Sequence, residues 1–412
     1  MPFKKLFFSG VLTALLQVSV AQAQSQTKTK VLLIGTGGTI AGEARVVGGA
    51  TYDSGKLAVE ALLETIPEVK DEFELEGRQL ADPESATADN PAGAVNVNSS
   101  FIRERHWLIL ARWIQEALEG DRFDAVIVTH GTDTLEETAF FLQLTVKSSK
   151  PVFVVGAMRP SRNNADPDGP DNLRGAFRLA LDNRSRNKGV LVVAQFRVFP
   201  AYDVTKVRTY PSNLPIKSED LPVPFDAPNF GSLASIQKTG RTLKDWRITW
   251  NDRNRLLQED RKALELKFDA AKLVSLPEVP VLSQEVGNQA KELIRDYYLQ
   301  QKPEIRSFVL MGSGNCALTR ETRDYIAALA SRPDLVFVRS SHTASTHCHL
   351  KREDLWPNVL GAATLNPRHF KILLQLFQAA FDSDRKERET FRDALTAYLR
   401  ERVPYPYGLL PD

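Results

Sequence analysis

The strongest constraint on the fold is an alternation of apolar runs with helical periodicity in the first half of the chain. Four runs are apolar almost throughout, and segments with helical spacing lie among them: the runs are 30–34, 124–129, 151–156 and 189–194, and the helical segments are 102–118, 134–146 and 173–181. Strands that are apolar at every position, rather than at every second one, are typical of sheets buried on both faces. The alternation therefore predicts an α/β domain with a mostly parallel sheet between helices.

A second α/β pattern follows after a change of character. Prolines crowd residues 211–228, which indicates a loop, and residues 241–272 mix charges of both signs. Beyond them, strands are predicted at 307–311 and 335–339, and helices at 284–301, 319–330, from Asn366-Pro367 onward, and at 387–401. We therefore expect a larger N-terminal domain (24–240), a charged linker or insertion (241–272) and a smaller C-terminal α/β domain (273–412).

The N-terminus reads as a secretory signal peptide. Lys4 and Lys5 precede a mostly apolar stretch, and Ala21-Gln22-Ala23 provides a cleavage site of the small-x-small type after residue 23. The predicted location is therefore the periplasm or the medium. In that setting Cys316 and Cys348, the two cysteines of the chain, could form a disulfide. The formal net charge of +2 favours neither nucleic acid nor an anionic membrane as a partner.

Two of the predicted strands end in unusual turns. The first is Ile34-Gly-Thr-Gly-Gly-Thr-Ile-Ala-Gly42, and the second is Thr129-His-Gly-Thr-Asp-Thr-Leu-Glu-Glu137. Ligands of open parallel sheets bind at this end of the strands. The first turn fits neither nucleotide motif, because Ile40 stands where the dinucleotide fingerprint needs its third glycine and the Gly-Lys-Ser/Thr of a P-loop is absent.

The turns carry two hydroxyl groups and a carboxylate. Thr39 is a possible nucleophile if a base or a proton path activates it. Thr132 and Asp133 add a second hydroxyl and a carboxylate that could bind a substrate ammonium group, and exposed backbone N–H groups could bind a substrate carboxylate. Together these groups suit a site for an α-amino acid.

The same residues resemble a known family. Thr36–Gly42 and Thr129–Ala139, followed by Gly156-Ala-Met-Arg-Pro160 and Asp203-Val-Thr-Lys206, are similar to the signatures of the bacterial-type L-asparaginases, which include the glutaminase-asparaginases. The resemblance implies a two-domain asparaginase-like fold, no cofactor and a homo-oligomer, a dimer or tetramer. It also implies site roles: nucleophile Thr39, its activating lid residue Tyr52, second threonine Thr132 with partner Lys206, and substrate-binding residues Ser99, Ser100, Thr132 and Asp133.

The resemblance implies a reaction in which Thr39 attacks the side-chain amide of asparagine, ammonia leaves, and water hydrolyses the acyl-enzyme. Two alternatives stay open: glutamine as the main substrate, and a silent amino-acid-binding protein on the same fold. Thr134, three residues before Glu137, is expected to open a helix with a capping box. His130 is expected to be structural. His342, His347, Cys348 and His349 fit no standard zinc spacing, so we expect no metal.

Overall fold

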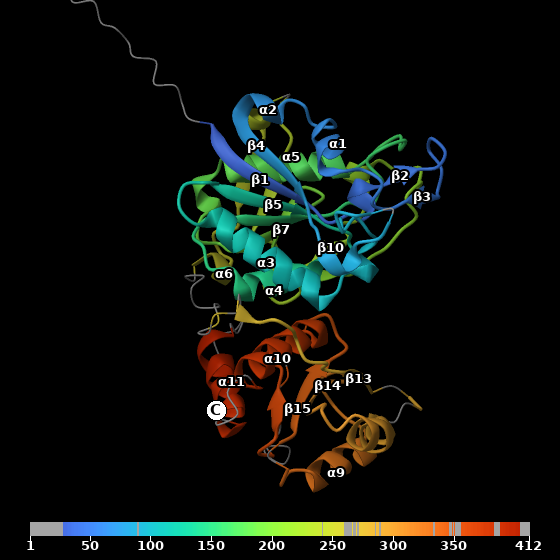
Figure 1. Ribbon diagram of the computed structural model, residues 1–412, viewed down its shortest axis with the longest axis vertical. Coiled ribbons are helices and arrows are strands. Elements are labelled where there is room, and N and C mark those ends of the chain that lie inside the picture. Colours follow the sequence, from blue (N-terminus) through green and yellow to red (C-terminus); the bar gives the residue numbers. More distant parts are fainter. Residues whose placement is uncertain are drawn as a thin grey trace, which may run out of the picture.

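The computed structural model describes residues 28–88, 90–240, 242–258, 266, 269, 272–284, 286–287, 290–332, 334–345, 348, 350, 356–382 and 388–403. They form two α/β domains that follow one another along the long axis of the molecule (Figure 1). The expected signal peptide, residues 1–23, lies outside the described residues. Among the described residues, no helix has the length and apolar character needed to cross a membrane.

The N-terminal domain is built on a sheet that has eight strands among the described residues. Its order is β12-β11-β8-β7-β6-β5-β1-β4. The strands are β1 (Thr29–Gly35), β4 (Phe73–Gln79), β5 (Ala125–Thr129), β6 (Val152–Val155), β7 (Val190–Ala194), β8 (Arg197–Pro200), β11 (Ala234–Gln237) and β12 (Arg247–Trp250). The five strands from β7 to β4 are parallel, and β8, β11 and β12 extend the sheet in antiparallel fashion. The predicted mostly parallel sheet is confirmed.

Alternate residues of the buried strands face two apolar layers. Leu32 and Val126 pack on one side with α3 (Glu104–Leu118) and α4 (Leu135–Thr145). Leu33 packs on the other side with α1 (Val59–Leu63) and α5 (Gly169–Ala180). Figure 1 shows α3 and α4 below the sheet and α5 above it. The uninterrupted apolar character of these strands thus has the cause inferred from the sequence, which is burial on both faces.

Smaller elements complete this domain: β2 (Glu43–Ala44), β3 (Tyr52–Asp53), α2 (Val69–Glu72), β9 (Thr205–Lys206), β10 (Phe225–Asp226) and α6 (Arg255–Gln258), with single 3-10 turns at Thr39–Ala41, Pro83–Ser85, Ser99–Phe101, Asn183–Ser185, Ser218–Asp220 and Leu243–Asp245. β2 and β3 form an antiparallel hairpin, and β9 pairs with β10. The large sheet continues past residue 240, since β12 pairs with β11. Residues 247–250 of the segment expected to be a linker therefore belong to the sheet.

The C-terminal domain has a smaller parallel sheet with the order β13-β14-β15-β16. Its elements are β13 (Val281–Ser283), α7 (Ala290–Glu292), a π-helical stretch (Leu293–Tyr298), α8 (Leu299–Gln301), β14 (Ser307–Gly312), α9 (Arg320–Ala328), β15 (Val336–Ser341), β16 (Val359–Gly361), α10 (Pro367–Asp382) and α11 (Arg388–Arg402). One face of this sheet and α10 share an apolar cluster with α4 of the N-terminal domain. The core is therefore continuous between the two domains.

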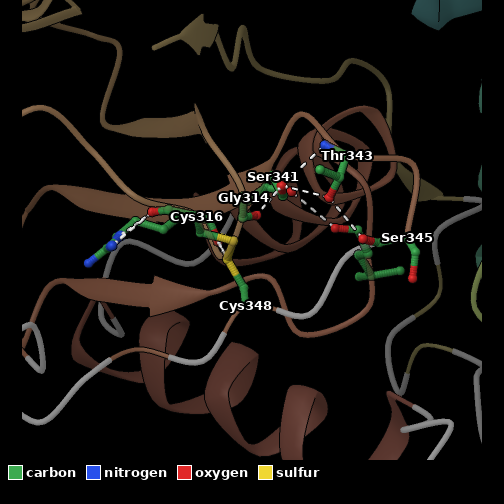
Figure 2. Close-up of a disulfide and its surroundings, with 9 residues drawn as sticks. Gly314, Cys316, Ser341, Thr343, Ser345 and Cys348 are labelled. Atoms are coloured by element: carbon green, nitrogen blue, oxygen red, sulfur yellow. Dashed lines mark hydrogen bonds between the residues drawn. A yellow bond between two sulfur atoms is a disulfide. The ribbon is translucent and has the colours of Figure 1, made fainter. Parts of the chain in front are cut away.

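A disulfide joins Cys316, which follows β14, to Cys348, which follows β15 (Figure 2). Their Cα atoms lie 5.6 Å apart. The loop after β15 is held further by Ser341, whose hydroxyl hydrogen-bonds to Thr343, and by Ser345, which donates to the side-chain oxygen of Asn229 at 3.0 Å. The disulfide therefore fixes a loop of the smaller domain that also reaches the larger one.

Candidate active site

The two threonine turns meet at the centre of the large sheet. From β1 the chain moves to β4 on one side of β1 and then to β5 on the other, so β1 and β5 flank the switch point where such sheets bind ligands. Gly35 and Thr129, the last residues of the two strands, are paired in register. The two turns, as expected from the sequence, leave the same edge of the sheet as neighbours.

Glycine lets the two turns cross in contact. Gly38 has a φ of 82°, and a Cβ at this position would lie 2.2 Å from the Cα of Gly131. A side chain at Gly131 would in turn collide with the Ser99 hydroxyl, at 2.7 Å. No other residue type fits Gly38 without displacing the second turn. This crossing brings the hydroxyl groups of Thr39 and Thr132 into one small volume.

Thr39 is buried at the start of its 3-10 turn and faces the β2–β3 hairpin. Its hydroxyl is 2.9 Å from the hydroxyl of Tyr52. Tyr52 opens β3, and the hairpin is tied to the body of the domain through the backbone N–H of Ala44, which donates to Arg162 O at 3.1 Å. The hairpin is therefore closed over Thr39, and the phenol can exchange a proton with the threonine hydroxyl.

Thr132, Asp133 and Lys206 form the second cluster of the site. The Lys206 ammonium group donates to the Thr132 hydroxyl at 2.9 Å and to the Asp133 carboxylate at 2.7 Å. The lysine side chain is 14% exposed and the aspartate side chain 57% exposed. The carboxylate thus keeps an open side for a ligand, while the ammonium group is held against the threonine oxygen.

Ser99 lies beneath this cluster. It is 2% exposed, and its hydroxyl oxygen accepts the backbone N–H of Asp133 at 3.2 Å. Ser100 differs from its neighbour, since it is exposed and its hydroxyl donates to Asn98 at 3.2 Å. The structure therefore brings Ser99 to the threonine turns and leaves Ser100 at the rim.

All these groups except Ser100 line one cavity of about 210 Å³. Its lining is predominantly polar, and it comprises Gly38, Thr39, Tyr52, Asn98, Ser99, Gly131, Thr132, Asp133, Met158, Lys206, Thr209, Tyr210 and Ser212. Hydroxyl groups, an ammonium group and a carboxylate converge on a volume suited to a small zwitterionic molecule. The arrangement has the parts of an acyl-transfer site: a nucleophile candidate with a proton partner, and charged groups for binding.

His130 lies behind the second turn and does not face the cavity. Its Nε2 is 2.9 Å from the Thr138 hydroxyl, which accepts the indole N–H of Trp107 at 2.8 Å, and its Nδ1 is 2.8 Å from Gly131 O. Because the Gly131 carbonyl can only accept, Nδ1 carries the His130 proton and donates it to Gly131 O, and the Thr138 hydroxyl donates to Nε2. Complete burial lowers the pKa of His130 to about 4. The ring is therefore neutral and supports the Gly131 turn.

A buried carboxylate joins the lysine cluster to the C-terminal domain. Glu136 on α4 is 1% exposed and accepts the backbone N–H of Lys206. Its other oxygen accepts a hydrogen bond from the Arg368 guanidinium, at 2.9 Å, from the first turn of α10. A buried carboxylate is costly unless it is paired in this way. The position of Lys206 thus depends on a contact between the two domains.

Comparison with known proteins agrees with this geometry. The family model for the N-terminal domain of asparaginases matches residues 30–247. The chain is 34% identical to L-asparaginase 2 of Escherichia coli (84% of this chain and 88% of that protein) and 41% identical to the glutaminase-asparaginase of Acinetobacter glutaminasificans (84% and 94%). The chain belongs to the asparaginase family.

A solved member of the asparaginase family has the same architecture. The crystal structure described as a probable cytoplasmic L-asparaginase from Campylobacter jejuni superposes with a TM-score of 0.73 at 27% identity, over 90% of this chain and 99% of that one. A further relative, 32% identical over 88% of this chain and 91% of its own length, is named a probable periplasmic L-asparaginase of Haemophilus influenzae. Membership therefore covers both domains.

One local prediction for this asparaginase-family site is wrong. Thr134 precedes α4, but its side chain makes no capping hydrogen bond. Its hydroxyl donates instead to Ser99 O at 2.9 Å, because the segment around Ser99 lies against the turn; this carbonyl also accepts the backbone N–H of Ile102. Thr134 therefore ties two segments of the site together rather than closing a capping box with Glu137.

Several site residues were not found by sequence reasoning. Glu136 and Arg368 are separated by 232 positions; of the other three, Ser212 lies in the proline-rich loop 211–228, and Thr209 and Tyr210 directly precede it. For Thr209, Tyr210 and Ser212, the available signal was their closeness to Lys206 in the sequence. For Glu136, the available signal was a carboxylate at the start of a helix whose centre, Ala139–Leu142, is apolar.

No group of three or more His, Cys, Asp or Glu side chains in the described residues is placed to hold a metal ion. Cys348 of the histidine-rich segment is engaged in the disulfide, and His342 is described, whereas His347 and His349 lie outside the described residues.

Proposed function

We propose that the protein hydrolyses the side-chain amide of L-asparagine to L-aspartate and ammonia, with Thr39 as nucleophile. The observation that carries this proposal is the convergence of two pairs on one cavity: Thr39 with Tyr52, and Thr132 with Lys206. A cavity built only to bind an amino acid has no need of a hydroxyl held by a phenol and another held by an ammonium group. The names of the bacterial relatives support the same substrate.

In the proposed reaction, the Thr39 oxygen attacks the amide carbonyl carbon of the substrate. Tyr52, at 2.9 Å, relays the threonine proton toward the departing nitrogen. The carbon–nitrogen bond then breaks, ammonia leaves, and the substrate acyl group remains as an ester on Thr39. Water attacks this ester, which releases aspartate and restores the hydroxyl.

The oxyanion formed at each stage needs hydrogen-bond donors. Thr39 is the first residue of its 3-10 turn, so its backbone N–H has no partner within the turn. Within the described residues, neither this N–H nor that of Thr132 donates a hydrogen bond to the protein. We assign both as the oxyanion donors, a role worth roughly 3–4 kcal/mol per donor in comparable sites.

The proposed roles of the second cluster follow from its charges. The half-exposed carboxylate of Asp133 binds the substrate α-ammonium group, and the buried Ser99 supports the binding of the substrate carboxylate. Lys206 holds the Thr132 hydroxyl by a charge-assisted hydrogen bond, which polarises the oxygen and favours transfer of its proton. We assign Ser100 to the rim, where it contacts the substrate only through Asn98.

The test is ammonia release with asparagine and glutamine measured side by side. Thr39→Ala should abolish release, whereas Thr39→Ser keeps a hydroxyl and should retain part of it. A glutaminase is the second candidate, because the relative that is 41% identical is named a glutaminase-asparaginase. A glutamine rate above the asparagine rate would decide for that candidate. Tight amino-acid binding without Thr39-dependent release would identify a silent binding protein.

We further propose that the protein is exported and forms a homo-oligomer, the family's usual tetramer. The Cys316–Cys348 disulfide supports export, because disulfides persist in oxidising compartments. The signal-like N-terminus and the relative named periplasmic agree with it. Cell fractionation with N-terminal sequencing tests the first proposal: a mature chain beginning at Gln24 is expected. Light scattering after gel filtration tests the second.

A further inference from the structure

A segment with no role in the proposed reaction forms one side of the substrate cavity. We call residues 207–217 the wall segment. It follows β9 directly, and three of its side chains line the cavity together with Thr39 and Lys206, namely Thr209, Tyr210 and Ser212. Tyr210 is the largest of the three and is half-buried.

The wall segment is held in place by buried contacts. The Arg159 guanidinium, on a residue that is 2% exposed, donates to the carbonyl oxygens of Leu214 and Ile216 at 3.1 and 2.6 Å. The hydroxyl of Ser212, itself 6% exposed, donates to Ala50 O at 3.1 Å. A loop anchored in this way keeps its side chains at fixed positions. A side chain that discriminates between substrates by their size must be held in this way.

These anchors place the wall segment at the reacting end of the cavity. Ala50 lies two residues before Tyr52, whose hydroxyl contacts Thr39. Tyr210 also interacts electrostatically with Asp168 and Arg159, at the base of the turn after β6. The ammonium-binding group proposed above, Asp133, belongs to the other cluster, beside Ser99. Tyr210, two residues before Ser212, therefore belongs to the part of the wall segment that is tied to the hairpin of Tyr52.

Open space lies on both sides of the wall segment. A second cavity of about 300 Å³ is lined by Arg159, Leu214 and Ser212, and Ser212 also lines the substrate cavity. Tyr210 itself lines the substrate cavity, so a smaller side chain at this position would enlarge that cavity.

We propose that Tyr210 is a specificity-determining residue, whose ring limits the depth of the cavity so that the side chain of asparagine fits and the extra methylene group of glutamine is disfavoured. This inference rests on the proposed amidohydrolase function. Discrimination by one methylene group in a shaped pocket amounts to roughly 10- to 200-fold in kcat/KM.

Two substitutions of Tyr210 separate the role of its ring from that of its hydroxyl. Its hydroxyl forms no hydrogen bond with the described residues, and burial with the nearby Asp168 raises its pKa, so the group is neutral. Tyr210→Phe therefore removes neither a charge nor a bonded partner and keeps the ring, whereas Tyr210→Ala removes the ring. Tyr297→Ala, on the exposed π-helical stretch of the C-terminal domain, is the matched control.

The experiment measures kcat/KM for asparagine and glutamine with the full chain and its variants. We expect Tyr210→Ala to raise the glutamine-to-asparagine ratio at least about tenfold, and Tyr210→Phe and Tyr297→Ala to leave it within about threefold. Tyr210→Leu, which retains part of the packing, should shift the ratio in the same direction and serves if the alanine variant does not fold.

Two results would overturn the inference: an unchanged ratio in a folded Tyr210→Ala or Tyr210→Leu variant, or an equal shift in Tyr210→Phe. The Thr39→Ala variant, measured in the same series, separates this failure from failure of the proposed function. Thr39-dependent release with an unmoved ratio contradicts only the role of Tyr210, whereas no release from either amide contradicts the proposed function itself.

Discussion

Removing the Cys316–Cys348 disulfide should destabilise the protein by an amount that can be calculated from the structure. The bridge closes a loop with a sequence separation of 32 residues. In the chain-entropy model, such a loop stabilises the folded state by about 3.7 kcal/mol at 25 °C, because the bridge restricts the unfolded chain. Both cysteines are buried. Alanine is apolar, so the double substitution places no unpaired polar side chain in the buried site.

The assay is urea unfolding of the Cys316→Ala/Cys348→Ala double variant and the native chain, followed by circular dichroism. Under oxidising conditions, the variant should lose about 2–4 kcal/mol of unfolding free energy, the usual range for a native disulfide. With a strong reductant present, the two proteins should unfold alike, because the native chain then lacks the cross-link in its unfolded state.

Either of two results would refute this reasoning. A loss below about 1 kcal/mol would show that the unfolded chain is not restricted by the bridge as the entropy model requires. A loss that persists in reductant would assign the effect to packing of the sulfur atoms in the folded state instead of to the cross-link.

Three further predictions concern the site. Gly38→Ala should lower the unfolding free energy by more than about 2 kcal/mol in thermal unfolding, because its Cβ would lie 2.2 Å from the Gly131 backbone; an unchanged melting temperature would contradict the crossing of the turns. Arg368→Met should lower kcat about tenfold, equivalent to 1.4 kcal/mol, with KM nearly unchanged, because Glu136 loses the partner that helps it hold Lys206; an unchanged kcat would show that Lys206 needs no support from the C-terminal domain. His130 should contribute a loss of stability as the pH drops from about 6.5 to 4, because it is neutral when buried, with a pKa of about 4, and binds a proton on unfolding; in pH-resolved denaturation, His130→Asn should lose less stability over this interval than the native chain, and equal losses would contradict the assignment.

The parts of the structure that could be predicted from sequence are those specified by local pattern. Strands such as β1 and β5 are apolar throughout because both of their faces are buried, and this signal lies within a few residues. The threonine turns were found for a similar reason, since Thr39 and Thr132 stand in short segments of unusual composition directly after those strands.

The parts that escaped prediction depend on contacts between distant segments. Strands β4 and β12 carry partly exposed residues and lie at the two edges of the sheet, so their sequences lack the continuous apolar signal. Thr134 is a residue type typical of a helix cap, but its hydroxyl donates to a carbonyl group 35 residues away in the sequence. The Glu136–Arg368 contact joins the two domains, and no local sequence pattern predicts a contact between residues so far apart.

The central claim is that Thr39 is the nucleophile of an asparagine amidohydrolase. The most direct test measures ammonia release from L-asparagine by the chain from Gln24 to Asp412 and by its Thr39→Ala variant, each confirmed to be folded. We predict release by the native chain and a loss of more than about a thousandfold in the variant, as expected when a nucleophile is removed. Release that survives the substitution, or a folded native chain that releases no ammonia, would contradict the account.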